Sequence, residues 1–221
     1  MFCDIHTHSN PHPDVAAVVD ISGREDCFVF YDGSKHHFFS AGIHPKSIGE
    51  DWKNKLSGIE MLAGKNNFAG VGECGLDKFS DCPRGLQEEV FEAQLSLCQR
   101  IDKPIIIHCV RLYTDVVRLI KKVNFQNPAI FHGYNGNPDV TAQLLKLPNA
   151  FFSFSASTFA TPETSGAKSL PLIPTTRILT ETDCGENSNM PLTIKLLADK
   201  KNIEPHPMQQ MIFENFWRVM S

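Results

Sequence analysis

The chain has 221 residues, a formal net charge of −4 and 21% charged residues, an ordinary composition for a globular protein. This length suits one domain over residues 1–221, because (β/α) barrels routinely reach this size as a single unit. The negative net charge offers no global attraction to nucleic acid or to an anionic membrane. The composition therefore excludes a broadly basic, DNA-wrapping protein, but not an enzyme that grips one or two phosphates through a local site.

The cysteines and the N-terminus bear on the cellular compartment. Seven cysteines, an odd number without a Cys-x-x-Cys pair, favour a reducing cytoplasm over a disulfide framework or a zinc knuckle. The start, Met1-Phe2-Cys3-Asp4, lacks the basic and apolar regions of a signal peptide, and the longest apolar run is too short to span a bilayer. We expect a cytoplasmic protein without membrane association, and the sequence shows no obligate protein partner.

The first predicted strand carries two histidines two residues apart. In Asp4-Ile5-His6-Thr7-His8, alternate side chains point to the same side of a strand, so Asp4, His6 and His8 share one face. Two imidazoles on a rigid backbone make half of a metal site, and Asp4 could orient one ring through a hydrogen bond.

The segment after this strand is unusual for a barrel. Residues 15–21 and 27–31 are rich in β-forming residues, with a turn signal at Asp32-Gly33. No helical pattern fits between His8 and Phe39, so the first crossover of a barrel would be trimmed.

From residue 38 onward, short apolar runs alternate with helical periods, which indicates a parallel sheet with helices outside it. Asp81 is expected to cap one helix and Asn137 another. The predicted strands cover residues 38–43, 68–72, 105–107, 129–131, 150–155 and 177–180, and the predicted helices cover 50–65, 83–101, 111–123, 137–147, 191–200 and 207–220.

Five of the predicted strands end in a residue that can bind metal. The active site of a (β/α) barrel lies at the C-terminal ends of its strands. Singly, these residues could be hydrogen-bonded core histidines, a loop acid and a helix cap, but their recurrence at one end of the sheet predicts a site. Four imidazoles and two carboxylates are more ligands than one tetrahedral zinc ion binds. They suit two metal ions with a metal-bound water as nucleophile. The candidates are His6, His8, Glu73, His108, His132 and Asp183.

Six stretches, in order along the chain, resemble the signatures of the TatD family of metal-dependent hydrolases and DNases in the amidohydrolase superfamily. Asn215-Phe216-Trp217 is also similar to the family's closing motif. The six stretches are Asp4-Ile5-His6-Thr7-His8, Gly42-Ile43-His44-Pro45, Gly72-Glu73-Cys74-Gly75-Leu76-Asp77, Pro104-Ile105-Ile106-Ile107-His108, Phe131-His132-Gly133 and Leu179-Thr180-Glu181-Thr182-Asp183.

The resemblance implies a role for each position. His6, His8 and Asp183 would bind one metal, His108 and His132 the other, and Glu73 would bridge them. Asp183 and Glu73 would be catalytic, with Asp183 taking the proton of the attacking water. His44 would line the substrate side, although it could equally be a turn residue before Pro45. Arg111 could bind a substrate phosphate or be a solvated residue at a helix start.

Three features depart from the family pattern. The segment between His8 and His44 is short, Arg111 stands one residue later than the family's arginine, and Asp183 is followed by Cys184-Gly185 where the family has a proline two residues on. Cys74 and Cys184 lie near the expected metals and could be sensitive to oxidation. Phe151, Phe152 and Phe154 fit a core better than a base-stacking platform.

The sequence therefore predicts a slightly trimmed TIM-type (β/α) barrel with a dinuclear metal centre. Its expected activity is hydrolysis of phosphodiester bonds, as a DNase-like exonuclease on accessible or single-stranded DNA ends. Two alternatives stay open: a deacylase or esterase acting on a small metabolite, and a metal-binding protein without catalysis. The two divalent ions would be zinc, manganese or magnesium, and the nitrogen-rich donors favour the first two.

Overall fold

The computed structural model describes residues 1–23, 35–185 and 189–221. Eight parallel strands form one sheet in which each strand pairs with the next along the chain. The predictions for residues 27–31 and Asp32-Gly33 lie outside the described residues. The strands are β1 (Phe2–Thr7), β2 (Val15–Asp20), β3 (His37–Ala41), β4 (Phe68–Asp77), β5 (Ile105–Val110), β6 (Ala129–Phe131), β7 (Ala150–Phe154) and β8 (Ile178–Thr180).

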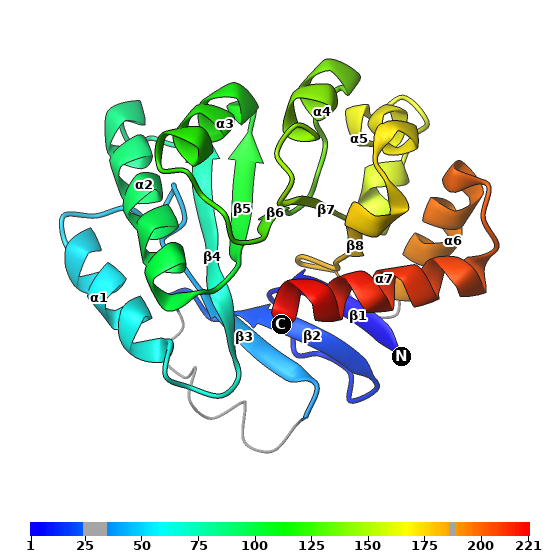
Figure 1. Cartoon of the computed structure of the whole chain (residues 1–221), viewed down its shortest axis with the longest axis horizontal. Coiled ribbons are helices and arrows are strands. Elements are labelled where there is room, and N and C mark those ends of the chain that lie inside the picture. The colour runs from blue at the N-terminus through cyan, green and yellow to red at the C-terminus, as the bar shows by residue number, and fades with distance from the viewer. Residues whose placement is uncertain (24–34, 186–188) are drawn as a thin grey trace.

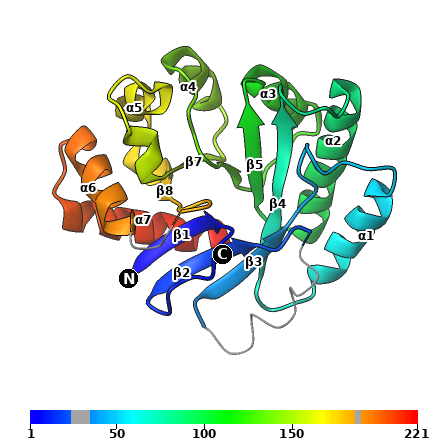
Figure 2. The ribbon, with the colours of Figure 1, turned by 180° about the vertical axis from the view of Figure 1, so that it is seen from behind.

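The helices lie on the outside of the curved sheet, as Figures 1 and 2 show from opposite sides. Within the described ranges, no helix combines the length and apolarity needed to cross a membrane. The α-helices are α1 (Trp52–Leu62), α2 (Arg84–Ile101), α3 (Tyr113–Lys122), α4 (Pro138–Leu144), α5 (Ser165–Ser169), α6 (Met190–Lys201) and α7 (Pro205–Met220), and the 3-10 helices are η1 (Ala156–Phe159), η2 (Leu170–Leu172) and η3 (Thr175–Arg177).

The predicted TIM-type fold is confirmed, including its trimmed beginning. Residues 8–14, all described, connect β1 to β2 without a helix, and these two strands pair in parallel. The last strand returns to the first: Thr7 and Asp183 form a parallel bridge, and Thr180 donates a hydrogen bond to the Cys3 carbonyl. The ring of strands thus closes at the end where the candidate ligands lie.

The interior is apolar, as the sequence pattern requires. Ile105, Ile106 and Ile107 of β5 are all buried, because this strand has neighbours in the sheet and helices behind it. Phe152 and Phe154 of β7 are completely buried, so they belong to the core, whereas Phe151 is partly exposed beneath the Arg218 guanidinium.

Two glycines bring β4 and β5 into close contact around Glu73. Gly72 has φ +146° and Gly75 has φ +145°, which L side chains rarely adopt, and a Cβ at Gly75 would lie 2.0 Å from the His108 carbonyl oxygen. Only glycine lets the two backbones approach this closely. The glycines therefore set Glu73 directly beside His108.

Two sequence-based details are wrong. Glu73 and His108 do not end their strands, because β4 continues to Asp77 and β5 to Val110. The pairing of these two strands extends as far as Asp77 and Val110, which is why they remain regular past the ligands.

Asp81 does not cap α2, whose N-cap is Pro83 without a side-chain hydrogen bond. The other predicted cap is correct, since the Asn137 side chain accepts a hydrogen bond from the Val140 amide.

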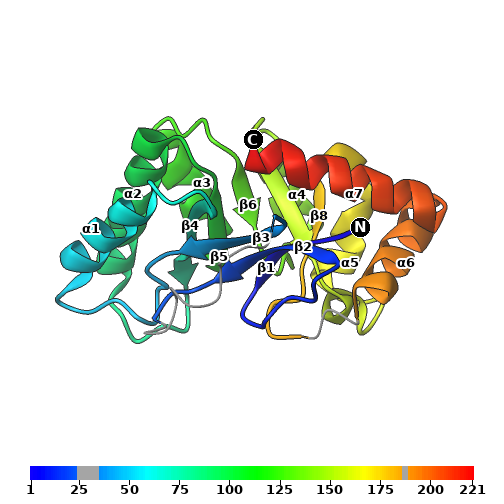
Figure 3. The same cartoon turned by 90° about the horizontal axis from the view of Figure 1, so that it is seen from below.

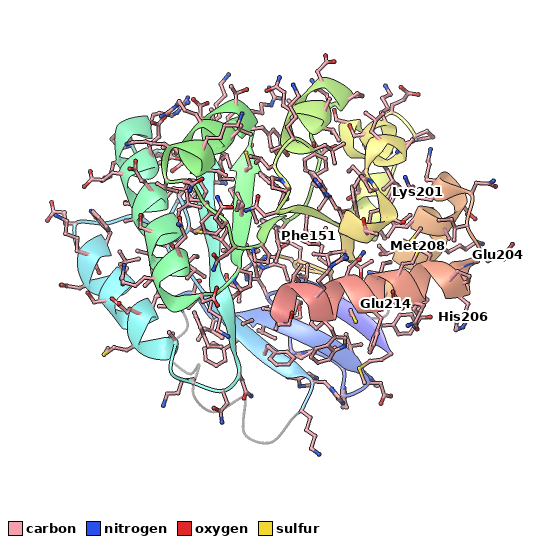
Figure 4. All side chains as sticks on the ribbon, viewed as in Figure 1. Phe151, Lys201, Glu204, His206, Met208 and Glu214 are labelled. Atoms are coloured by element: carbon pink, nitrogen blue, oxygen red, sulfur yellow. The ribbon has the colours of Figure 1, made fainter. Side chains whose placement is uncertain are left out.

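The C-terminal helix α7 runs alongside β1, as seen from below in Figure 3. Buried Asn215 donates hydrogen bonds to the carbonyl oxygens of Thr175 and Ile178, at 2.7 and 2.8 Å, and so fixes the start of β8. Figure 4 labels Glu204, the exposed residue before this helix, together with His206 and Glu214, which are exposed on it, and Met208, which is buried. The helix thus holds the last strand at the end opposite the candidate ligands.

Candidate metal centre

Glu73 lies at the middle of the centre and offers one carboxylate oxygen to each side. Its side chain is only 9% exposed. Oε2 faces His6 and His8, and Oε1 faces His108 and His132. The structure therefore divides the donors into two groups around one carboxylate. We call His6, His8, Asp183 and Oε2 the first half-site, and His108, His132 and Oε1 the second half-site.

The first half-site is an open arrangement of donors. His6 Nε2 lies 3.7 Å from Glu73 Oε2 and 3.8 Å from Asp183 Oδ1, and the matching distances from His8 Nε2 are 3.4 and 3.6 Å. An N–H···O hydrogen bond usually measures about 2.7–3.2 Å, so these pairs are too far apart for strong ones. A tetrahedral ion with bonds of about 2.0–2.3 Å separates its ligands by about 3.3–3.8 Å. The donor spacing fits a metal ion.

The buried state of His6 supports the same assignment. Its side chain is 0% exposed, and among the described residues neither ring nitrogen has a hydrogen-bond partner. Leaving a buried polar group unpaired costs about 1–3 kcal/mol, which a coordinated cation at Nε2 would offset. The residues present thus fit the divalent ion that the family implies.

The second half-site is closed by hydrogen bonds. His108 Nδ1 lies 2.6 Å and His132 Nε2 lies 2.7 Å from the same oxygen, Glu73 Oε1. The two histidine nitrogens are 3.3 Å from each other. Here the carboxylate accepts from the imidazoles directly, and a cation bound to both rings would take the place of those protons.

Three buried carboxylates stand behind the histidines, and the sequence analysis did not assign them. Asp20 Oδ2 is 3.6 Å from His8 Nδ1, Asp77 Oδ2 is 3.3 Å from His108 Nε2, and Glu181 Oε1 is 3.8 Å from His132 Nδ1. Carboxylates in this position orient metal-binding imidazoles. Asp77 and Glu181 lie in two of the stretches that resemble family motifs, and Asp20 ends β2. A search for ligand-type residues at the C-terminal ends of strands could therefore have identified all three.

Asp4 occupies a different place from the one expected. Its buried carboxylate accepts hydrogen bonds from the Thr182 amide at 3.0 Å and the Thr182 hydroxyl at 2.6 Å. The next residue, Asp183, is held to β1 by two further backbone bonds, to His6 and His8. Asp4 therefore anchors the segment that carries Asp183.

Asp183 itself has φ +53°, a left-handed conformation that is uncommon for residues other than glycine. Such strained backbone concentrates at functional sites. Its side chain is 43% exposed, in contrast to the buried Glu73. Burial, followed by the negative charge of Glu181, raises the pKa of Asp183.

The protonation states of Glu73 and His6 suit cation binding. Burial alone would raise the pKa of Glu73, but hydrogen bonds from His108, His132 and His8 lower it well below its usual range. Burial, together with the neighbouring His132, lowers the pKa of His6 well below its usual value. An ionised carboxylate and a neutral imidazole are the donor forms that a metal ion requires.

His44 and Arg111 occupy different positions. His44 Nε2 lies 3.5 Å from Glu73 Oε1, and its ring centroid is 4.4 Å from that of His108, so it lies against the second half-site. Arg111 is exposed, has φ +58°, and places its guanidinium 5.4 Å from the centre of the Phe79 ring. The structure thus brings His44 to the donors and Arg111 to the rim.

Open clefts adjoin the centre. One of about 680 Å³ is lined by Arg111, Tyr113, Gly133 and Asn137, and Gly133 directly follows His132. Another of about 320 Å³ is lined by His8, His44, Glu73 and Lys55. A third of about 220 Å³ contains Asp183, Cys184 and Asn189.

The model of the family described as TatD related DNase matches residues 19–221. The chain belongs to the TatD family. It is therefore a member of a family of metal-dependent hydrolases, and the donors of the two half-sites are its candidate metal ligands.

Two curated relatives and one solved structure show the extent of the similarity. The chain is 30% identical over 149 residues to the uncharacterized metal-dependent hydrolase YabD of Bacillus subtilis, a match that covers 66% of this chain and 58% of YabD. It is 31% identical over 149 residues to the 3'-5' ssDNA/RNA exonuclease TatD of Edwardsiella piscicida, covering 65% and 56%. The chain thus spans little more than half the length of these relatives.

The crystal structure of YjjV, a TatD homologue from Escherichia coli K12, superposes with a TM-score of 0.85. The superposition covers 99% of this chain and 97% of YjjV at 18% sequence identity. At this identity the similarity establishes the fold.

Proposed function

We propose that this protein hydrolyses phosphodiester bonds at accessible or single-stranded DNA ends, as a metal-dependent exonuclease. The observation that carries the proposal is the pair of half-sites around Glu73, with Asp183 exposed at one side of them. The Edwardsiella relative is named a 3'-5' ssDNA/RNA exonuclease, which supports the same class of substrate.

The residues that would hold the metal ions are those of the two half-sites. His6, His8 and Asp183 would hold one ion, His108 and His132 a second, and Glu73 both. When bound, such a pair of divalent ions supplies an acidified water and positive charge that offsets the charge of the scissile phosphate.

Asp183 is the group we assign to the proton transfer. Its Oδ1 lies within 3.8 Å of His6 and His8, while part of its side chain is open to solvent and to the 220 Å³ cleft. Burial and the Glu181 charge, by raising the pKa of Asp183, make it a better proton acceptor than an exposed aspartate. In this proposal Asp183 takes the proton of the attacking water and Glu73 keeps its charge.

Local cations compensate for the negative net charge of the chain. Arg111 lines the 680 Å³ cleft that also contains Gly133, Lys55 lines the cleft beside His44, and Lys46 lies 3.1 Å from the Asp77 carboxylate behind His108. In the proposal, Arg111 binds a phosphate next to the scissile one, and His44 contacts an oxygen of the scissile phosphate. These contacts favour a chain end with few phosphates over a long duplex.

Phe79 provides a surface for a base. Phe79 is 63% exposed, although it is a large apolar residue, and the Arg111 guanidinium lies 5.4 Å from the centre of its ring. Stacking on an aromatic ring contributes about 1–3 kcal/mol per base and tolerates any sequence. Phe79 and Arg111 together therefore suit a nucleotide of a single strand.

The test is a cleavage time course on end-labelled single-stranded DNA, using protein reloaded with manganese, zinc or magnesium. We expect stepwise shortening by the wild type and a loss of about 10²–10⁴-fold in rate for Asp183→Asn at matched metal content. Asp199→Asn, an exposed aspartate on α6, is the matched control and should cleave normally. No shortening with any metal would contradict the nuclease proposal and would turn attention to small esters and N-acyl compounds.

A second comparison separates nucleotide binding from the chemistry. Phe79→Ala and Arg111→Ala should each raise KM for the oligonucleotide by about tenfold, since 1.4 kcal/mol of lost stacking or ion pairing corresponds to that factor. Turnover of bis(p-nitrophenyl) phosphate, which has neither a base nor a second phosphate, should stay within about twofold. Equal losses on both substrates would count against the proposed roles of the two residues.

A further inference from the structure

Cys184 adds a sulfur donor to the first half-site. Its Sγ lies 3.6 Å from Asp183 Oδ1, and one ligand atom each of His8, Asp183 and Cys184 lie within 4.8 Å of one another. Asp183 Oδ1 is thus within 3.8 Å of three other donors: His6 Nε2, His8 Nε2 and Cys184 Sγ. These separations match the edges of a metal coordination shell, about 3.3–3.8 Å for bonds of 2.0–2.3 Å.

The turn that carries Cys184 is closed by one hydrogen bond and anchored at Thr182. The Gly185 amide donates to the Thr182 carbonyl at 2.7 Å, which closes a turn over residues 183 and 184. The Thr182 side chain is bound to the buried Asp4 carboxylate at 2.6 Å. The sulfur is therefore presented beside Asp183 by a braced backbone.

A separate observation shows that the space beside these donors is built for a ligand. His6 is completely buried, its two ring nitrogens have no hydrogen-bond partner among the described residues, and its Nε2 points toward the Asp183 oxygen that Cys184 also contacts. A buried imidazole in this state needs a partner that the described part of the chain does not supply. A cation bound by His6, His8 and Asp183 meets that need, and Cys184 Sγ lies beside the Asp183 oxygen that would bind it.

We propose that the Cys184 thiolate is a further ligand of the metal ion in the first half-site and fits it to a thiophilic divalent ion, such as zinc, over magnesium. On binding, the thiol releases its proton to solvent and the sulfur donates an electron pair to the ion. Soft thiolate donors select zinc, whereas magnesium prefers oxygen donors. The inference rests on the proposed metal-dependent function, and it names the class of metal that the sequence leaves open.

The experiment uses the full chain, freed of metal with a chelator and titrated with cobalt(II). Cobalt bound to a thiolate gives an intense near-ultraviolet charge-transfer band, while cobalt bound only to nitrogen and oxygen gives weak visible bands. We expect the intense band in the wild type, its loss in Cys184→Ser, and its retention in Cys82→Ser, a partly exposed thiol on the loop before α2. Zinc affinity should fall at least about tenfold in Cys184→Ser, with magnesium affinity unchanged.

The outcomes separate this inference from the proposed function. Cobalt that binds with weak visible bands alone, or an intense band that persists in Cys184→Ser, would overturn the role of Cys184 while leaving the metal centre intact. Failure of the wild type to bind cobalt at all would overturn both. The intense band in the wild type, lost in Cys184→Ser but not in Cys82→Ser, supports the sulfur ligand.

Discussion

The two half-sites share one carboxylate, yet their donors are arranged differently. In the first, the donor atoms stand 3.4–3.8 Å apart, as they would around an ion. In the second, two histidine nitrogens approach Glu73 Oε1 to 2.6 and 2.7 Å and close the space with hydrogen bonds. The first half-site is therefore preorganised for a cation, whereas the second must give up hydrogen bonds to bind one.

This difference predicts unequal affinities. Ordering donors before binding lowers the free-energy cost of the event. At the second half-site, burial opposes the charged form of His132, but the carboxylates of Glu181 and Glu73 raise the pKa of His132 well above its usual value. A metal ion there must displace that proton and two hydrogen bonds to Glu73 Oε1, whereas at the first half-site the pKa of His8 is raised but that of His6 is lowered and the donors are already spaced for an ion. We therefore infer that the first half-site fills first and more tightly.

The largest expected effect comes from the carboxylate that both half-sites use. Glu73→Gln removes the charge between them, so metal affinity should fall by more than about 100-fold at both half-sites, since even second-sphere partners account for 10–100-fold. Isothermal titration with manganese, together with metal analysis, checks this. Glu163→Gln, an exposed acid that pairs with Lys168, is the control and should bind as the wild type does. Tight binding of one ion by Glu73→Gln would show that the carboxylate is not shared.

Removing one histidine from each half-site tests the order of filling. His6→Gln should abolish the tighter binding event, whereas His132→Gln should leave it and weaken the second by at least about tenfold. Manganese titrations followed by electron paramagnetic resonance distinguish the two events. If His132→Gln removed the tighter event, the inferred order would be reversed.

The carboxylates behind the histidines allow the same comparison with smaller changes. Asp20→Asn should weaken the first half-site and Glu181→Gln the second, each by about 10–100-fold, because these side chains orient His8 and His132. Both substitutions keep an oxygen that can accept the neighbouring backbone hydrogen bonds, from Ser22 and Gly133. Circular dichroism confirms that the fold is retained, and equal weakening of both events by either variant would argue against separate half-sites.

Substitution of His44, which lies beside the second half-site, should have the smallest effect, and this effect on stability should depend on pH. Burial lowers the pKa of His44 to about 4, so the folded metal-free protein keeps it neutral between about pH 6.5 and 4 while the unfolded chain takes up a proton. Its contribution to stability is full above pH 6.5 and falls as the pH drops toward 4. Relative to His44→Gln, the wild type should lose about 1–2 kcal/mol between pH 7 and pH 5.

Urea unfolding in the presence of a chelator measures this difference. His12→Gln provides the control, because it replaces a largely exposed histidine outside the metal centre. A pH dependence in His44→Gln equal to that of the wild type would mean that His44 is not held neutral by burial.

The sequence alone determined much of this molecule. Alternating apolar runs and helical periods predicted the (β/α) barrel, because a strand buried on both faces and an amphipathic helix each leave a local pattern. The paired histidines of β1 and the ligand-type residues on later strands predicted a shared site, because parallel strands present the same end to one edge. The absence of a helical pattern after His8 predicted the trimmed first crossover, which is present between β1 and β2.

Only the tertiary structure decided how the donors divide between two half-sites. Distances between His6 on β1, Glu73 on β4 and Asp183 after β8 depend on the closure of the sheet, and no local pattern encodes them. The same holds for Asp20, which lies behind His8, and for Cys184, which follows Asp183 in sequence but comes near His8 only in the folded chain. The local sequence also did not predict the lengths of the strands. β4 continues beyond Glu73 because its pairing with β5 extends to Asp77. Local patterns fix which elements form, and long-range packing fixes which side chains meet.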